Sequence, residues 1–336
     1  MLTELSNLRP ELTARPARLE DVEAVCELCN ACSLRMEGMP THDPTEQRID
    51  WEIPGFDMET DTVVVAATGA PIAYASAWDT DEPHVRVGCF LRVHPDHDDP
   101  GLEEALLRWL EARARKAIDL APPEARVTAS HGAFSKDERR KDLLVRHGYE
   151  LVRHFVRLRI EMSEPPALGE IPEGLEIRPF DPETDLRAVA TAVREAFRDH
   201  WGFAENDLEQ ELSQWAHWVH EDPDFDPGVW LIAWDGDEVV GACNGSAKRP
   251  EAENLAYIYT LAVRKPWRGR GIARTLLRRS FAAYYERGKT VVDLDADAAN
   301  LTGAMRLYEG VGMSVVWQND SYEKELRPGI DLQNRG

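Results

Sequence analysis

The segment Val263-Arg-Lys-Pro-Trp-Arg-Gly-Arg-Gly-Ile-Ala273 decides how this chain is interpreted. An apolar strand-like run precedes the segment and a helical spacing of apolar residues follows it, so the sequence predicts a strand, a turn and a helix. Glycine lets a backbone approach a ligand closely, and the first N–H groups of a helix attract anions. Arginines beside such a turn can pair with phosphate. The segment therefore predicts a cradle for a pyrophosphate.

Two other phosphate-binding loops do not fit this segment. The dinucleotide fingerprint needs glycine at the position of Arg274, and the P-loop needs a Gly-Lys-Ser/Thr run that is absent. Arg-Gly segments that bind RNA are longer and repeated, whereas this one is single and lies between a strand and a helix. An arginine-rich turn that binds nothing is the remaining alternative.

The spacing Arg268-x-x-Gly271-x-Ala273 resembles the Arg/Gln-x-x-Gly-x-Gly/Ala signature of the Gcn5-related N-acetyltransferase family. The resemblance implies that acetyl-CoA is the co-substrate, with its pyrophosphate on the turn and its pantetheine arm on the edge of the preceding strand. The residues that it implies for binding acetyl-CoA are Leu261, Ala262, Val263, Arg268, Gly269, Arg270, Gly271, Ile272, Ala273 and Asn300.

A second stretch, Asn300 to Met313, resembles the family's Asn…Ala-x-x-Leu-Tyr-Glu-x-x-Gly-Phe segment, with Met313 in place of phenylalanine. The resemblance implies that the Tyr308 hydroxyl protonates the departing CoA thiolate. It also implies that a backbone N–H of the strand at residues 261–263 stabilises the oxyanion. The alternative for Tyr308 is an aromatic side chain that merely packs at a helix end.

The general base has two expected positions. Relatives use a carboxylate either in the strand before the cradle or at the end of the next strand, and these positions hold Tyr257 and Asp295. A water relay could replace either residue. Each of the two could equally be a structural hydrogen-bonding residue.

Aromatic and acidic residues early in the second half predict where the acceptor amine binds. Asp199 could hold an ammonium group, and Trp201, Phe203 and Trp218 could close over a substrate. Tryptophans at helical spacing can also be plain core residues. No metal is expected, because the histidines at 217 and 220 have no further clustered ligands.

The whole chain reads as one pattern repeated twice. Its 336 residues fit about two domains. Each half opens with Arg-Pro before a helical pattern (Arg15-Pro16, Arg178-Pro179), continues with a hairpin, a strand, a turn and a helix, and ends after Gly148 or Gly312. We expect an α+β fold duplicated in tandem, each half a twisted mixed sheet flanked by helices, with a linker over 163–174 between domains 1–162 and 175–328.

The first half lacks both expected functional features. Its cradle position, Val93 to Glu103, carries aspartates instead of arginines, and Pro100 removes a backbone N–H. Counting back from Gly148 as from Gly312 places Leu144 where Tyr308 stands. Activity is therefore expected only in the second half, an arrangement similar to the mycothiol synthase type of the family, although Tyr257 replaces the strand carboxylate of that type.

Composition limits the remaining possibilities. A net charge of -22 disfavours nucleic acid as a partner. No stretch approaches the roughly 20 apolar residues that span a bilayer, and no secretory signal is recognised, so we expect a cytoplasmic protein, monomer or homodimer. The expected function is transfer of an acetyl group to a primary amine of a small molecule by direct attack. The alternatives are a protein or peptide N-acetyltransferase and a non-catalytic acyl-CoA-binding regulator.

Overall fold

The computed structural model describes residues 5, 8–97, 99–299 and 303–335. The chain forms two compact units. The first consists of Met1–Arg153 with Asn319–Leu332, and the second of His154–Gln318 with Gln333–Gly336. Both units therefore draw on two separate stretches of sequence.

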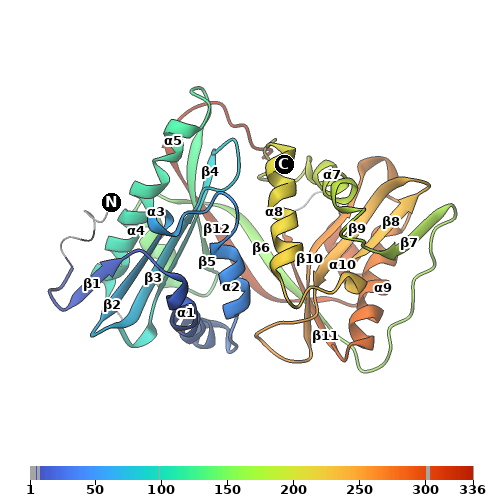
Figure 1. The fold of residues 1–336 in the computed structure, drawn as a ribbon, viewed down its shortest axis with the longest axis horizontal. Helices are drawn as coiled ribbons and strands as arrows, with labels where there is room; N and C mark the ends of the chain where they lie inside the picture. The colour runs from blue at the N-terminus through green and yellow to red at the C-terminus, as the bar shows by residue number, and fades with distance from the viewer. Residues whose placement is uncertain (1–4, 6–7, 98, 300–302, 336) are drawn as a thin grey trace. The chain divides into compact units, whose positions relative to one another are not determined.

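The first unit is a mixed sheet with strands in the order β1-β2-β3-β4-β5-β12 (Figure 1). Neighbouring strands are antiparallel except β4 and β5, which are parallel. The strands are β1 (Leu12–Arg15), β2 (Thr62–Ala67), β3 (Ala70–Trp78), β4 (Arg86–Val93), β5 (Val127–Phe134) and β12 (Ser314–Arg327). The helices are α1 (Val22–Glu37), α2 (Pro44–Trp51), α3 (Met58–Asp61), α4 (Pro100–Ala114), α5 (Ala117–Leu120) and α6 (Glu138–Arg146).

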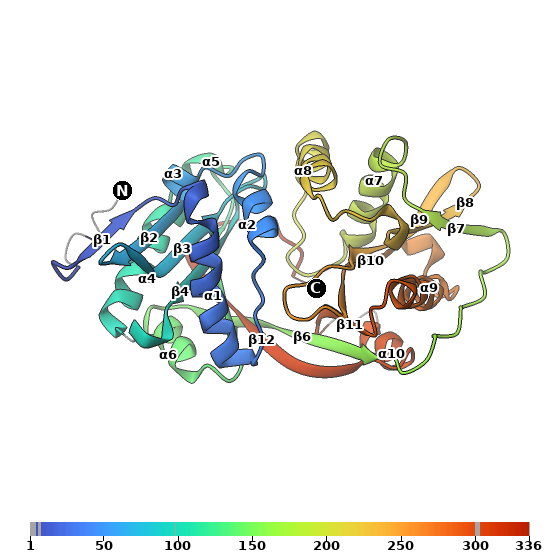
Figure 2. The ribbon, with the colours of Figure 1, turned by 60° about the horizontal axis from the view of Figure 1, so that its bottom comes forward.

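The second unit repeats this plan with strands in the order β7-β8-β9-β10-β11-β6, and only β10 and β11 run parallel. Its strands are β7 (Leu175–Pro179), β8 (Leu231–Asp235), β9 (Glu238–Ser246), β10 (Leu255–Val263), β11 (Val291–Asp297) and β6 (Glu150–Glu161). Its helices are α7 (Leu186–Phe197), α8 (Leu208–Glu221), α9 (Ile272–Glu286) and α10 (Ala304–Glu309). Figure 2 shows α9 and α10 from a second direction.

Alternating side chains of the second sheet build two separate cores. Ile232 and Val239 pack with α7 and α8 on one face, whereas Ala233 and Val240 pack with α9 and α10 on the other. This period of two is what a strand imposes when both of its faces are buried. The helix that follows the predicted cradle therefore lies on a defined side of the sheet.

The last strand of each sequence half belongs to the other unit. β6 pairs with β11 from Val291↔Glu161 to Asp297↔Phe155, and β12 pairs with β5 from Asn319↔Phe134 to Arg327↔Val127. The domain limits expected from the sequence keep each last strand with its own half, because strand spacing gives no information on which of two similar sheets a strand joins. The expected linker 163–174 lies within the second unit, where Glu170 O accepts a hydrogen bond from Thr275 Oγ1 at 2.9 Å.

The predicted duplication and the α+β fold are confirmed. The two Arg-Pro openings even repeat the same ion pair, Arg15 with Asp21 at 2.6 Å and Arg178 with Asp185 at 2.7 Å. Arg178 also lies over the ring of Trp234, its Cζ 4.4 Å from the ring centroid. Among the described residues, no helix combines the length and the apolar character that crossing a bilayer requires.

Candidate active site

Strands β10 and β11 diverge in the middle of the second sheet. They pair only from Leu255↔Val291 to Ile258↔Leu294, although β10 continues to Val263. The register of β10 against β9 shifts between Ile258 and Thr260, and a β-bulge of this kind bends a strand away from its neighbour. Beyond the bulge, the edge of β10 towards β11 carries no described ladder pairing. Its backbone groups are therefore available to an extended ligand.

The predicted cradle follows directly after β10. Gly269 and Gly271 have φ of 80° and 84°, the left-handed region that glycine adopts without strain. Gly271 is the N-cap of α9, and no side chain of the described residues caps this helix end. A Cβ at Gly271 would meet nothing within 4 Å. The positive end of the α9 dipole thus faces open space, as an anion site requires.

A cavity of about 440 Å³ joins the diverging strand, the cradle and the segment around Tyr308. Its lining includes nine of the residues predicted from the sequence: Leu261, Ala262, Val263, Arg268, Gly269, Gly271, Ile272, Ala273 and Tyr308. Arg270 is not among the lining residues, and its Nη1 lies 3.9 Å from the Asp235 carboxylate. The prediction for Asn300 falls outside the described residues.

Tyr308 is held in α10 with its side chain against the α9 core. It is only 8% exposed, and burial raises the pKa of its phenol to about 12. Tyr308 lines the cavity, and no described residue forms a hydrogen bond with its hydroxyl. A protonated hydroxyl in this position can donate to a ligand.

Arg268 and Asp199 form an ion pair beside the cavity. The two carboxylate oxygens of Asp199 accept from Arg268 at 2.5 and 2.9 Å, and Arg268 lowers the pKa of Asp199. Arg268 also donates to the carbonyl oxygens of Val263 and Ala196. The sequence predicted that Asp199 binds the ammonium group of the acceptor. In the structure its carboxylate is already neutralised by the Arg268 guanidinium. The pair instead fixes the turn against α7.

Asp295 and Tyr257, the two expected bases, do not line the cavity. The Asp295 carboxylate accepts two hydrogen bonds from Arg157 at 2.9 and 3.0 Å, so taking up a proton would break this pair. The Tyr257 ring lies between the guanidinium groups of Arg157 and Arg249, 5.0 and 5.1 Å from its centroid. Burial, together with the Asp295 charge, raises the pKa of Tyr257, which keeps it protonated and unsuited to a base role.

The three aromatic residues expected around the acceptor are also absent from the cavity lining. The ring of Trp201 packs edge-on against Phe155, with centroids 6.2 Å apart. Phe203 O accepts from the N–H of Asn334 at 2.8 Å, which ties this loop to the end of the chain. Trp218 lies within α8. We expected these residues to close over the acceptor, whereas in the structure Trp201 packs against Phe155 and Phe203 anchors its loop.

His200 lines the cavity and was not singled out as a catalytic residue from the sequence. Its ring packs edge-on against Phe197, with centroids 4.4 Å apart, and burial lowers its pKa. The imidazole is therefore neutral at physiological pH and able to accept a proton. The sequence places His200 directly after the α7 helix and next to Asp199. That position alone does not predict a catalytic role, because no spacing rule places the end of α7 beside β10, which lies about 60 residues later.

Comparison with known proteins agrees with this geometry. Residues 190–313 match the model of the acetyltransferase (GNAT) family. The structure of a GCN5-related N-acetyltransferase from Sphaerobacter thermophilus is 35% identical, with a TM-score of 0.78 over 97% of this chain and 99% of that chain. The chain belongs to the GCN5-related N-acetyltransferase family. It is an N-acetyltransferase, as the signature predicted.

Two further relatives support the tandem architecture of this acetyltransferase. A mycothiol acetyltransferase from Geodermatophilus obscurus is 27% identical over 87% of this chain and 91% of its own length. A tandem GNAT protein from the clavulanic acid biosynthesis pathway has the same fold, with a TM-score of 0.69 over 95% of this chain and 100% of that chain at 14% identity. The predicted resemblance to the mycothiol synthase type is confirmed.

The first unit of the acetyltransferase lacks the counterpart of this site. Its helix α4 follows β4 as α9 follows β10, but Asp99 caps α4 by accepting from the N–H groups of Gly101 and Leu102 at 2.9 and 3.3 Å. Leu144, the counterpart of Tyr308, is fully buried. In the described part of the chain, no group of three or more histidine, cysteine or acidic side chains is placed to hold a metal ion.

Proposed function

We propose that the second unit transfers the acetyl group of acetyl-CoA to a primary amine of a small molecule by direct attack in a ternary complex. One observation carries the proposal: the uncapped N-terminus of α9 and the unpartnered hydroxyl of Tyr308 line the same cavity. The first can hold a pyrophosphate and the second can donate a proton to a thiolate. Relatives named for mycothiol support a small-molecule acceptor.

In this proposal, acetyl-CoA supplies an activated thioester and the protein supplies position and protons. The amine nitrogen forms a C–N bond with the carbonyl carbon, and the carbonyl oxygen gains negative charge. A backbone N–H on the free edge of β10 stabilises this charge. The C–S bond then breaks, its electron pair leaves on sulfur, and the Tyr308 hydroxyl gives the sulfur its proton.

The nitrogen must also lose a proton, and we propose that His200 accepts it. Burial keeps the pKa of His200 below its usual value, so the imidazole is neutral when the amine attacks. His200→Gln is expected to lower kcat by about tenfold to a hundredfold, at the lower end of what proton transfer contributes. A loss confined to the affinity for acetyl-CoA would instead assign His200 to donor binding.

Calorimetric titration with acetyl-CoA tests the binding half of the proposal. Ala273→Glu adds a carboxylate at the N-terminus of α9 without requiring a left-handed backbone, and Gly101→Glu adds one at the matching end of α4. We expect one site of micromolar order in the wild type, lost in Ala273→Glu and kept in Gly101→Glu. Two wild-type sites, or loss in the Gly101 variant, would contradict the assignment to the second unit.

Turnover then identifies the acceptor class. Release of free CoA is measured with a panel of small amines and with a panel of peptides that carry free N-termini or lysines. Saturable release with a small amine, abolished in Tyr308→Phe, is the expected result. Saturable release with peptides alone would replace the small-molecule acceptor by a protein or peptide.

A further inference from the structure

The first unit contains a cavity of about 400 Å³ that no step of the proposed reaction uses. It lies where β4 and β5 diverge, because these strands pair only from Arg86↔Thr128 to Cys89↔His131. Its lining includes Gly88, Ser130 and Gly132. Because glycine has no side chain and serine a small one, these positions leave space above the sheet. The volume is in the range of sites for small molecules.

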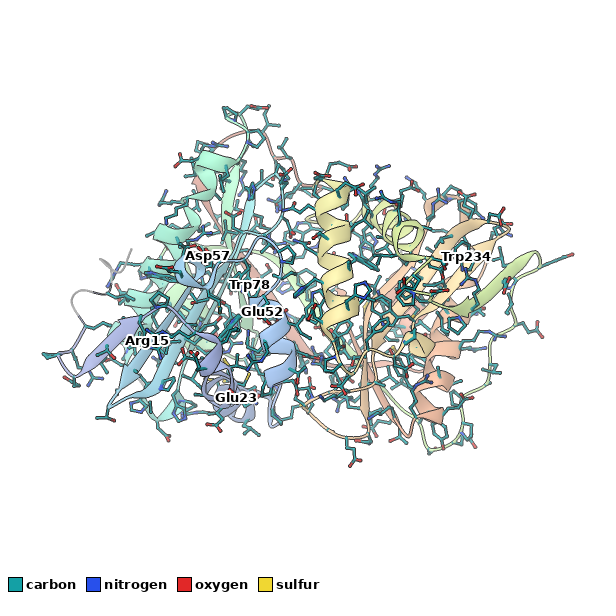
Figure 3. All side chains as sticks on the ribbon, in the orientation of Figure 1. Arg15, Glu23, Glu52, Asp57, Trp78 and Trp234 are labelled. Carbon is teal, nitrogen blue, oxygen red and sulfur yellow. The ribbon has the colours of Figure 1, made fainter. Side chains whose placement is uncertain are left out.

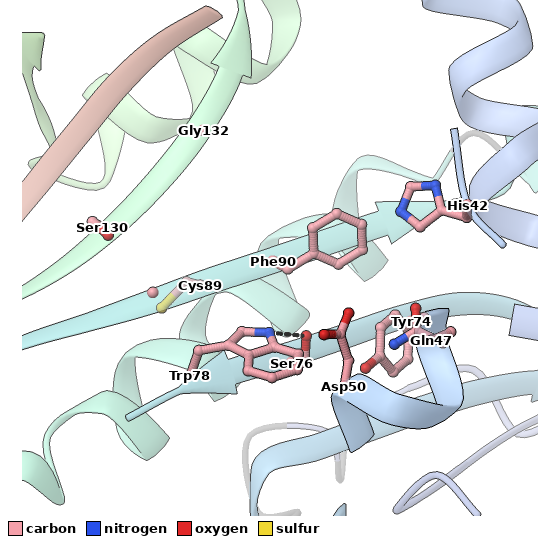
Figure 4. A pocket seen from close by; sticks show the side chains of 11 residues that line it. His42, Gln47, Asp50, Tyr74, Ser76, Trp78, Cys89, Phe90, Ser130 and Gly132 are labelled. Carbon is pink, nitrogen blue, oxygen red and sulfur yellow. Dashed lines mark hydrogen bonds between the residues drawn. The ribbon is translucent and has the colours of Figure 1, made fainter. Parts of the chain in front are cut away.

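Three aromatic rings form the walls of this cavity: Tyr74 and Trp78 from β3 and Phe90 from β4 (Figure 4). The Trp78 ring stacks on Phe56 with centroids 4.2 Å apart, and its Nε1 donates to Ser76 Oγ at 3.0 Å. The Tyr74 hydroxyl accepts from Trp51 Nε1 at 2.9 Å. Because these contacts hold the rings in place, a ligand would not have to order them on binding.

One carboxylate enters this aromatic cavity. Asp50 reaches from α2 into the space between Trp78 and Tyr74, facing Phe90 (Figure 4). No described residue forms a hydrogen bond or an ion pair with its carboxylate, and burial together with the nearby Glu46 raises the pKa of Asp50 to about 7. A half-buried carboxylate without a described partner is poorly compensated, so a cationic ligand would supply the missing counter-charge.

The charges around the cavity favour a cation over an anion. Two basic residues approach the aromatic wall. His42 lines the cavity with its ring centroid 5.7 Å from that of Phe90, and its Nδ1 lies 3.0 Å from Thr41 Oγ1. Arg92 has its Cζ 4.4 Å from the Phe90 centroid but does not line the cavity, and no described contact joins either residue to the Asp50 carboxylate. The faces of aromatic rings carry negative potential and attract ammonium groups. A phosphate or carboxylate ligand would meet Asp50 and ring faces of the same sign.

We propose that this cavity is a binding site for a small organic cation, a primary or quaternary ammonium, with Asp50 as counter-ion and Tyr74, Trp78 and Phe90 as an aromatic cage. The site is independent of the acetyl-transfer proposal, since all its residues lie in the first unit. It occupies the point of strand divergence that corresponds to the β10–β11 divergence of the second unit. The first unit would thus keep an amine site although Asp99 fills its anion position.

Ligand-observed saturation-transfer NMR on the full chain tests the proposal. The probes are choline and its uncharged isostere 3,3-dimethylbutan-1-ol. Choline is expected to give a saturable signal of millimolar or tighter affinity, and the isostere at least a fivefold weaker one, because only choline gains the charge interaction. Asp50→Asn is expected to weaken choline binding at least tenfold.

Glu52→Gln is the matched control, since it removes the same charge two residues away on the exposed end of α2 (Figure 3). Its choline affinity should stay within twofold of the wild type. Trp78→Leu should weaken binding as Asp50→Asn does; if that variant does not fold, the Asp50 and Glu52 variants decide the matter. No saturable choline binding, equal binding of the isostere, or binding that survives Asp50→Asn overturns the proposal.

Discussion

Helices α9 and α4 occupy equivalent places in two copies of one fold, but only the N-terminus of α4 is capped by a described side chain. At α9 the N-cap is Gly271, and within the described part of the chain no side chain accepts from the first N–H groups. At α4 the N-cap is Asp99, whose carboxylate takes the first two available N–H groups. One helix end is left for a ligand and the other is closed by its own chain. The difference teaches that a capping carboxylate can occupy a helix N-terminus that the equivalent helix of a duplicated fold leaves open.

The largest effect is expected at Tyr308, the proposed proton donor, whose counterpart in the first unit is Leu144. Tyr308→Phe should lower kcat at least a hundredfold, because the thiolate loses its acid, while the affinity for acetyl-CoA stays within threefold. Steady-state release of CoA and calorimetry measure the two quantities. Tyr285→Phe, the same change on α9 outside the cavity lining, is the control. Full activity of Tyr308→Phe would show that water, not Tyr308, protonates the CoA thiolate.

A second prediction imposes the cap of α4 on α9. Gly271→Asp places a carboxylate at the N-cap, where aspartate tolerates the left-handed backbone better than most residues. We expect the affinity for acetyl-CoA to fall about thirtyfold through charge repulsion, which corresponds to roughly 2 kcal/mol. Gly271→Asn has the same shape without the charge and should lose much less. Equal losses in both variants would show that backbone strain, not charge, is responsible.

A third prediction compares one strand position in the two units. His131 and Asp295 both lie seventeen residues before the glycine that ends the motif, at 148 − 131 and 312 − 295. Asp295 is ion-paired, whereas His131 is buried with an unpartnered Nε2, and burial lowers its pKa to about 3. The folded chain therefore binds this proton less readily than the unfolded chain.

The consequence is a loss of stability as the pH falls below the ordinary histidine pKa of 6.5 and continues towards about 3. Between pH 7.5 and 5.0, His131 should lower the free energy of unfolding of the wild type by on the order of 2 kcal/mol. The His131→Leu variant should lack this loss. Urea unfolding at both pH values measures it. A pH dependence unchanged by the substitution would mean that His131 does not cause it.

The smallest effect is expected from opening the closed helix end. Asp99→Ala removes the cap of α4 and should lower the free energy of unfolding by about 1 kcal/mol. No second acetyl-CoA site should appear, because the first unit still lacks arginines at the turn. Thermal unfolding and calorimetry measure the two outcomes. A new acetyl-CoA site in this variant would show that the cap alone had silenced the first unit.

The turn and helix N-terminus that line the cavity were predictable from sequence because they are local. Gly271, Ile272 and Ala273 are consecutive, and their spacing fixes a strand, a turn and a helix N-terminus whatever surrounds them. Tyr308 followed from a second local pattern on a short helix. The repeat, the hairpins and the helix after each Arg-Pro opening were likewise predicted from period and turn residues.

The acceptor side was not predictable, because it depends on pairings distant in sequence. Asp199 pairs with Arg268, 69 residues later in the chain, and Asp295 pairs with Arg157, 138 residues earlier. Each carboxylate was expected to act on the acceptor amine, and each is instead bound to an arginine. No periodicity in one segment reveals a partner in another. The exchange of β6 and β12 was missed for the same reason, since both sheets offer an antiparallel place beside a central strand.

That exchange has a consequence for the growing chain. The sheet of the first unit is completed by residues 319–327, which are synthesised only after the strands of the second unit. At about 5 to 20 residues per second, the ribosome needs on the order of ten to thirty seconds between completing Arg153 and delivering β12. During this interval β5 presents an unpaired edge of eight residues, from Val127 to Phe134. The first unit therefore cannot complete its own sheet until nearly all of the second unit has been made.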